Sequence, residues 1–173
     1  KNPELMRIVL SIATEHFRDD PELQTQSLSN VLWALAILRW IPDDEFLTVF
    51  QDRTLIELRK GAFSHQGLTN TIWAFAQLGI KPNETLMREL TNELGEKVSE
   101  FTSAQAVSNS LLALASFEYW PDEWIMEAYR AKIVELYQED AIPDIDWAQL
   151  FQANDMFESC SPCGAVLTDP KMV

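Results

Sequence analysis

The chain has 173 residues, of which 47% are hydrophobic and 23% are charged, so it can bury a sizeable core and is not disordered. Its 13 Lys and Arg residues against 27 Asp and Glu give a net charge of −14, which disfavours polyanions and anionic membranes as partners. No apolar run approaches the ~20 residues that a membrane-spanning helix needs. The chain opens on Lys1 without a signal-like stretch, so we expect a mature product or an excerpt.

The first predicted element is a helix that begins at Pro3 and has apolar residues at helical spacing. Those residues are Leu5, Ile8, Val9 and Ile12. A proline followed by an acidic helical segment returns, at intervals of 39 or 40 residues, at Pro42, Pro82 and Pro121. We predict that each proline lies in the first turn of its helix, where a missing N–H costs nothing. These four predicted helices are named helices B, and their expected buried positions include Phe46, Val49, Phe50, Leu86, Leu90 and Leu94.

A second kind of helix, named helix A, is predicted at 26–38, 66–78 and 105–117. Each carries one recurring phrase, which in the first copy is Leu-Ser-Asn-Val-Leu-Trp-Ala-Leu-Ala-Ile-Leu from residue 28. The asparagines of the three copies lie 40 and 39 residues apart, and they are Asn30, Asn70 and Asn109. Repetition at this period is the signature of stacked helical repeats, in which no unit buries its apolar face alone.

The composition of helix A predicts close packing. Its paired alanines are small enough for neighbouring helices to approach closely, and we expect Trp33 and Trp73 to be buried beside them. Gly79 is placed to end the second helix A in the left-handed conformation, and Gly61 to end the helix B that begins at Pro42. The A helices are almost free of charged residues, so the acidic residues belong mainly to the B layer and the tail.

The last predicted helix runs from Pro143 to Phe157 and matches the repeat phrase only loosely, so we expect a terminal cap. Its apolar residues are Trp147, Leu150, Phe151 and Phe157. Asp144 and Asp146 are expected to be solvated acids at its start. Residues 159–173 favour irregular chain.

These elements predict an all-α, right-handed solenoid of α-α hairpins with about three units of 39 to 40 residues. A half-unit helix precedes the units and a capping helix follows them. We predict one array over residues 1–158, with an irregular tail at 159–173. The expected units lie near 3–40, 42–79, 82–120 and 121–157.

The phrase Leu-x-Asn-x-Leu/Ile-Trp-Ala-x-Ala-x-Leu, followed by a proline-led helix, resembles the octotricopeptide repeats of organelle gene-expression proteins. That family is related to RAP-domain proteins and to FAST-kinase-like mitochondrial proteins. The resemblance covers about residues 3–125, although Leu112 replaces the tryptophan in the third copy. The segment Trp147-Ala-Gln-Leu-Phe151-Gln is similar to the one that precedes a RAP domain. The resemblance implies a helical solenoid, a plastid or mitochondrial location and binding of single-stranded RNA.

The candidate partner-binding residues lie on one side of helix A, at 100° per residue. They are Gln26, Asn30, Ile37, Gln66, Asn70, Gln77, Gln105, Asn109 and Ser116, with Trp120 near a turn. Amide side chains can present hydrogen bonds to bases or to a peptide backbone. Because the Gln and Asn positions do not vary between copies, we favour an amide ladder that ties neighbouring repeats together by hydrogen bonds.

Three positions of helix A that vary between copies are better candidates for specificity, although we slightly favour packing variation as their explanation. They are Ser27/Gly67/Ala106, Val31/Thr71/Ser110 and Ile37/Gln77/Ser116. The tryptophans near the turns are expected to be core residues rather than exposed anchors for a partner. They are Trp40, Trp120 and Trp124.

No catalytic arrangement, metal-ligand cluster or cofactor motif emerges from the sequence. His65 adjoins Ser64, but adjacent residues are not a catalytic dyad. Cys160 and Cys163 form a C-x-x-C pair without a second ligand pair, so no zinc site is expected.

The sequence therefore predicts a non-enzymatic binding protein without metal or cofactor. We favour a scaffold, adaptor or peripheral subunit that docks on a protein partner in an organellar assembly, such as a photosynthetic or respiratory complex. The alternative is an organellar single-stranded RNA-binding factor for transcript maturation, stability or translation. The net charge and the scarcity of Lys and Arg in helices A favour the protein partner.

Overall fold

The computed structural model describes residues 2–160, and this part of the chain folds into eight α-helices and one short 3₁₀ helix without strands. The chain divides into two compact units, Lys1–Leu90 and Thr91–Val173, which are described separately. The helices that begin in the first unit are α1 (Pro3–Asp19), α2 (Thr25–Leu38), α3 (Asp44–Arg59), α4 (His65–Leu78) and α5 (Glu84–Lys97). The elements of the second unit are η1 (Val98–Glu100), α6 (Ala104–Ser116), α7 (Glu123–Gln138) and α8 (Asp144–Cys160).

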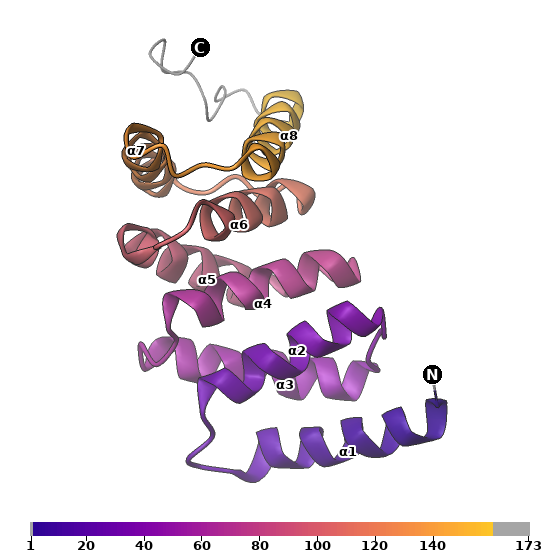
Figure 1. Ribbon diagram of the computed structural model, residues 1–173. Coiled ribbons are helices and arrows are strands. Elements are labelled where there is room, and N and C mark those ends of the chain that lie inside the picture. Colours follow the sequence, from indigo (N-terminus) through magenta and orange to yellow (C-terminus); the bar gives the residue numbers. More distant parts are fainter. Residues whose placement is uncertain (1, 161–173) are drawn as a thin grey trace. The chain divides into compact units, whose positions relative to one another are not determined.

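Helices two apart in the chain pack side by side in the first unit (Figure 1). α2 packs against α4, α1 packs against α3, and α2 also contacts α3, with which it forms a hairpin. Helices A therefore stack on helices A, and helices B stack on helices B, as in helical-repeat proteins. The predicted all-α repeat of packed helix pairs is confirmed, and the predicted bounds of the three helices A are correct to within one residue.

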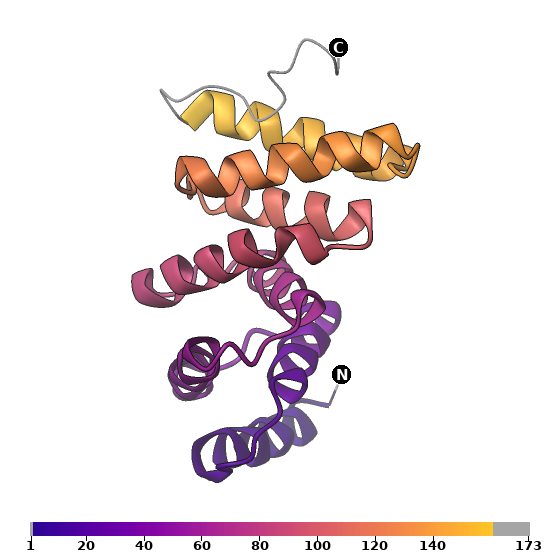
Figure 2. The same cartoon turned by 90° about the vertical axis from the view of Figure 1, so that its left-hand side faces the viewer.

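The second unit follows the same rule (Figure 2). α6 packs against α8, while α7 contacts both α6 and η1. Tyr129 of α7 is fully buried, and its hydroxyl donates a hydrogen bond to Oγ of Ser110 on α6 at 2.9 Å. Its ring also meets the ring of Phe101 edge to face, with 6.2 Å between the centroids. Helix B is thus fixed to helix A of the same hairpin.

Phenylalanines fill the core of the first unit. Phe17 of α1 packs between Phe46 and Phe50 of α3, with ring centroids 5.9 Å apart in each pair. Phe50 also meets Phe75 of α4 edge to face at 5.8 Å. Each buried ring contributes roughly 1.5–3 kcal/mol from its removal from water. Of the buried positions predicted in α3 and α5, only Val49 is not fully buried, whereas the apolar residues Leu5, Ile8, Val9 and Ile12 of α1 are exposed.

Three of the four B helices, α3, α5 and α7, begin two residues after the proline that was predicted to start them. The Asp43 carboxylate accepts a hydrogen bond from the N–H of Phe46, and the side chain of Asn83 caps α5 in the same way. Asp or Asn is a far better N-cap than the residue before the proline. The buried prolines Pro42, Pro82 and Pro121 therefore precede the cap, so their predicted place in the first turn is wrong. Only Pro3 lies in the first turn of its helix.

Two glycines adopt the left-handed backbone conformation at helix ends, as predicted. Gly79 closes α4 with φ of 67°, and Gly61 follows the end of α3 with φ of 64°. The same conformation recurs after α2 and α6, where the residues are Arg39 (φ 47°) and Glu118 (φ 52°). A side chain in this region costs roughly 1–2 kcal/mol, so the helix end is imposed there by packing and by the capping hydrogen bonds.

The last helix extends further than predicted, because α8 continues to Cys160. Residues 159 and 160 therefore belong to a helix and not to an irregular tail. The rest of the predicted tail and Cys163 of the C-x-x-C pair lie outside the described residues.

Candidate functional site

One side of α2 is polar and exposed. The opposite side, with Leu28, Leu32 and Leu35, is buried as predicted. The exposed residues recur at intervals of three or four and therefore share one side of the helix. We name them the α2 stripe, which consists of Gln26, Asn30, Trp33 and Ile37.

Trp33 belongs to this stripe and is 44% exposed, so the prediction that it is a core residue is wrong. Its position explains the exposure, because Trp33 follows Asn30 by three residues and precedes Ile37 by four. α4 carries an equivalent stripe, in which Trp73 is half-buried, and its members are Gln66, Asn70, Trp73 and Gln77. The α6 equivalent in the second unit consists of Gln105, Asn109, Leu112 and Ser116.

The amide side chains of the three stripes make no hydrogen bond within the described part of the chain, so the predicted hydrogen-bonded ladder is wrong. Other groups join the two hairpins of the first unit. Thr25 Oγ1 donates to the carbonyl of Ala62 at 3.1 Å, while the hydroxyl of Ser29 turns back to its own helix. The amides therefore keep their donors and acceptors for water or for a ligand.

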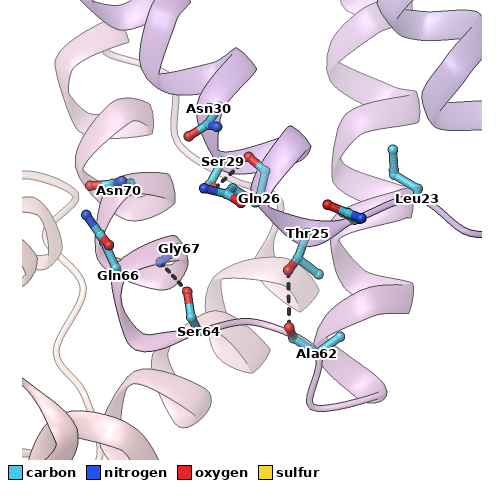
Figure 3. A pocket seen from close by; sticks show the side chains of 11 residues that line it. Leu23, Thr25, Gln26, Ser29, Asn30, Ala62, Ser64, Gln66, Gly67 and Asn70 are labelled. Carbon is cyan, nitrogen blue, oxygen red and sulfur yellow. Dashed lines mark hydrogen bonds between the residues drawn. The ribbon is translucent and has the colours of Figure 1, made fainter.

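A hollow of about 540 Å³ separates the first turns of α2 and α4 (Figure 3). Gln26 and Asn30 line it from α2, and Gln66 and Asn70 from α4. Ser64 at its floor is the N-cap of α4, because its hydroxyl accepts the N–H of Gly67. Its volume falls in the range of small-molecule pockets, roughly 300–1,000 Å³, and so is large enough for one nucleobase or a short peptide stretch.

The stripes are neutral because α2, α4 and α6 contain no Asp, Glu, Lys or Arg. The acidic charge is concentrated elsewhere. The first unit, 1–90, has nine Lys and Arg against twelve Asp and Glu, a net charge of −3. The second, 91–173, has four against fifteen, a net charge of −11. Repulsion of an anionic ligand by the negative net charge is therefore expected mainly at the second unit.

The equivalent hollow of the second unit has a different chemistry. It measures about 480 Å³ between α6 and α8, and Gln105 and Gln149 line it together with Asp146. Asp146 is buried and accepts a hydrogen bond from the hydroxyl of Ser108 at 2.9 Å, so its predicted role as a solvated acid is wrong. Because it contains a carboxylate, this hollow is less suitable for an anion than the neutral hollow between α2 and α4.

Of the three variable positions, only the last is exposed in all copies, at Ile37, Gln77 and Ser116. The other two series face neighbouring helices. Thr71 and Ser110 are fully buried, and their hydroxyls donate to carbonyls of their own helices. Packing therefore explains those two series.

The tryptophans near the turns differ from one another. Trp120 is half-buried, and its ring meets Phe157 edge to face at 4.8 Å between centroids. Trp40 is half-buried as well, whereas Trp124 on α7 is 44% exposed. Trp120 is thus held by α8, which limits the surface it can offer to a partner.

Within residues 2–160, no group of three or more His, Cys, Asp and Glu is arranged to hold a metal ion. No helix in the described range is long and apolar enough to cross a membrane. The neutral hollow is lined by Ser64 but not by His65.

Residues 14–138 match the model of a protein family described as the Tbc2 translation factor, N-terminal domain. This range is well over half of the chain. The chain belongs to the Tbc2 N-terminal domain family. Curated proteins compared with the chain gave no match. The part that matches the Tbc2 N-terminal domain begins within α1 and ends with α7, so it includes all three stripes and excludes α8. The finer resemblance to octotricopeptide repeats stays a prediction.

Proposed function

We propose that this chain is the RNA-binding repeat domain of an organellar translation factor, and that the stripes of α2 and α4 hold single-stranded RNA. The observation that carries the proposal is the exposure of Trp33 on the same side as amides without hydrogen bonds. Single-stranded RNA is recognised by stacking of bases on aromatic rings and by hydrogen bonds to base edges. Membership of a translation-factor family supports the same ligand.

Binding of this kind relies little on phosphate neutralisation. α2 and α4 contain no Lys or Arg, and none of the residues that line the hollow between them is charged. Affinity would come from stacking, worth roughly 1–3 kcal/mol per base, and from the amides. The exposed variable residues Ile37 and Gln77 would then distinguish one base from another.

A second candidate is a scaffold that docks on a protein partner in an organellar assembly. A neutral row of free amides also suits the backbone of an extended peptide, and Ile37 adds an exposed apolar contact. The net charge of −14 supports this candidate. Both candidates are non-enzymatic, and both assume a plastid or a mitochondrion.

The test is fluorescence anisotropy of labelled, short single-stranded RNA of randomised sequence with the full chain. Trp33→Ala should weaken binding by about 5- to 150-fold, the equivalent of one lost stacking contact. Trp124→Ala is the matched control, because it removes an equally exposed tryptophan from a B helix, and it should bind like the wild type. Circular dichroism would establish that both variants are folded.

The salt dependence separates this mode from ordinary phosphate binding. The slope of log K against log salt concentration should be shallower than about −2, because few counterions are released. Equal affinity for duplex RNA of the same length, or wild-type binding by Trp33→Ala, would refute the proposal. Binding of extended peptides but not of RNA would establish the second candidate instead.

A further inference from the structure

An aromatic patch lies on α7 and α8 in the second unit. We name it the aromatic patch, and it consists of Tyr137, Trp147 and Phe151, of which Trp147 is half-buried. The Trp147 ring meets Tyr137 edge to face, with 6.0 Å between centroids, and stacks on Phe151 at 5.9 Å. Phe151 is 54% exposed and Tyr137 is 50% exposed. An apolar surface of this kind marks a binding site more often than isolated exposed residues do.

The position of these rings in α8 indicates what shape of partner would cover them. Trp147 and Phe151 are the fourth and eighth residues of α8. The fourth and eighth residues of the other helices A are fully buried, and they are Leu28 and Leu32, Leu68 and Ile72, Val107 and Leu111. In those hairpins a helix B packs on helix A, as α3 does on α2 and α7 on α6. A helix in the equivalent place would cover the aromatic patch.

The charge around the patch indicates the chemistry of that helix. From Ile133 to Cys160 the chain has seven Asp and Glu and no Lys, Arg or His. Asp144 and Asp155 are exposed and flank Trp147 and Phe151 at helical spacing on α8. Neither of these two carboxylates forms an ion pair within the described residues. Lys and Arg of a partner would meet these carboxylates, and they also bind favourably over aromatic faces.

We propose that the aromatic patch binds a basic amphipathic helix of a protein partner, seated on α8 as a helix B is seated on helix A. Its apolar side would cover Trp147 and Phe151, and its basic side would face Asp144 and Asp155. Residues 161–173 fit poorly, since their only cation is Lys171. A second copy also fits poorly, because it carries the same charge of −14. This inference does not depend on RNA binding by the stripes.

The test uses the full chain and a labelled synthetic peptide with Leu and Lys at helical spacing, compared with the same peptide carrying Glu for Lys. The Lys peptide should bind and the Glu peptide should not. Phe151→Ser should weaken binding by about tenfold or more, as expected for an anchor residue. Asp144→Asn with Asp155→Asn should also weaken it and reduce its salt dependence. The matched controls are Ile41→Ser, which removes a side chain that is 70% exposed, and Asp52→Asn, and neither should change binding.

Wild-type binding of the Lys peptide by Phe151→Ser would overturn the proposal. A second outcome is that the full chain leaves the Lys peptide unbound while Phe151→Ser lowers its melting temperature. That result would show that the chain itself covers the aromatic patch, and it would refute the proposal. Concentration-dependent dimers that Phe151→Ser abolishes would identify a second copy as the occupant. Displacement of the peptide by single-stranded RNA, with loss of RNA binding in Phe151→Ser, would assign the patch to RNA. Trp33→Ala should bind the peptide normally, which separates this test from that of the proposed function.

Discussion

Gly95 of α5 lies against Trp124 and Ile125 of α7, and alanine at this position tests their packing. A Cβ atom at residue 95 would lie 2.8 Å from Cγ1 of Ile125 and 2.9 Å from two ring carbons of Trp124. Carbon atoms in contact prefer about 3.5–4.0 Å, so at least one neighbour would have to move. The Trp124 ring is 44% exposed and can turn aside, whereas Ile125 is only 1% exposed and is held by its surroundings.

Two effects of opposite sign decide the size of the change. Overpacking costs roughly 1–3 kcal/mol, and alanine gains about 1 kcal/mol over glycine inside a helix. We therefore expect Gly95→Ala to lower the free energy of unfolding by about 1 kcal/mol, because Ile125 cannot retreat. For a protein of this size that corresponds to a fall in Tm of about 2–4 °C. Urea unfolding followed by circular dichroism measures the free energy.

The control is Gly67→Ala in α4, whose Cβ would lie no closer than 3.3 Å to any neighbour. It should lower the free energy of unfolding less than Gly95→Ala does, because a neighbour at 3.3 Å has to move by only a few tenths of an ångström. Combining Gly95→Ala with Trp124→Ala should recover only part of the loss, since the contact with Ile125 remains. A Gly95→Ala variant that is about 1 kcal/mol more stable than the wild type would show the full gain in helix propensity, and would refute the close packing.

Two further predictions concern a helix cap and a buried phenol. Asp43→Ala should lower the free energy of unfolding by about 0.5–2 kcal/mol because it removes the N-cap of α3. Asp122→Ala should lower it less, because the Asp122 side chain makes no capping hydrogen bond. Equal losses of the two variants in urea unfolding would contradict this prediction. Burial raises the pKa of Tyr129 above its ordinary value of about 10, and the hydrogen bond with Ser110 offsets this only in part. The folded state therefore keeps the neutral phenol, so this contribution to stability is complete below about pH 10 and is lost as the pH rises further, by at most ~1.4 kcal/mol per pH unit. Tyr129→Phe should lose this alkaline dependence relative to the wild type in urea titrations, and an identical pH profile for both proteins would count against the burial argument.

The fold could be predicted because the signal is periodic and local. Recurring asparagine phrases placed all three helices A to within one residue, since each phrase fills one helix with buried positions at helical spacing. The starts of the B helices could not be placed from proline alone. Asp43 and Asn83 follow their prolines directly, and their capping hydrogen bonds decide where each helix begins. The preference of Asp and Asn for the N-cap could have corrected the prediction.

The candidate site was predicted in part. The amide positions were identified from helical geometry, and the same geometry places Trp33 beside Asn30. The large apolar ring of Trp33 favours a place in the core, but its angular position on α2 leaves it 44% exposed. The burial of Asp146 could not be predicted from the local sequence pattern. It depends on a hydrogen bond with Ser108, which lies 38 residues away in the chain.

Within each unit, helices stack on helices about one repeat away, and this stacking makes each unit modular. Because α2 meets α4 and α1 meets α3, local opening of one hairpin breaks contacts with its immediate neighbours only. Duplication or deletion of a whole module can therefore preserve most remaining contacts and change the length of the polar surface in discrete steps. Substitutions at the exposed residues Ile37 or Gln77 would leave the interior intact, so a lineage can change the chemistry of this surface at little cost in stability.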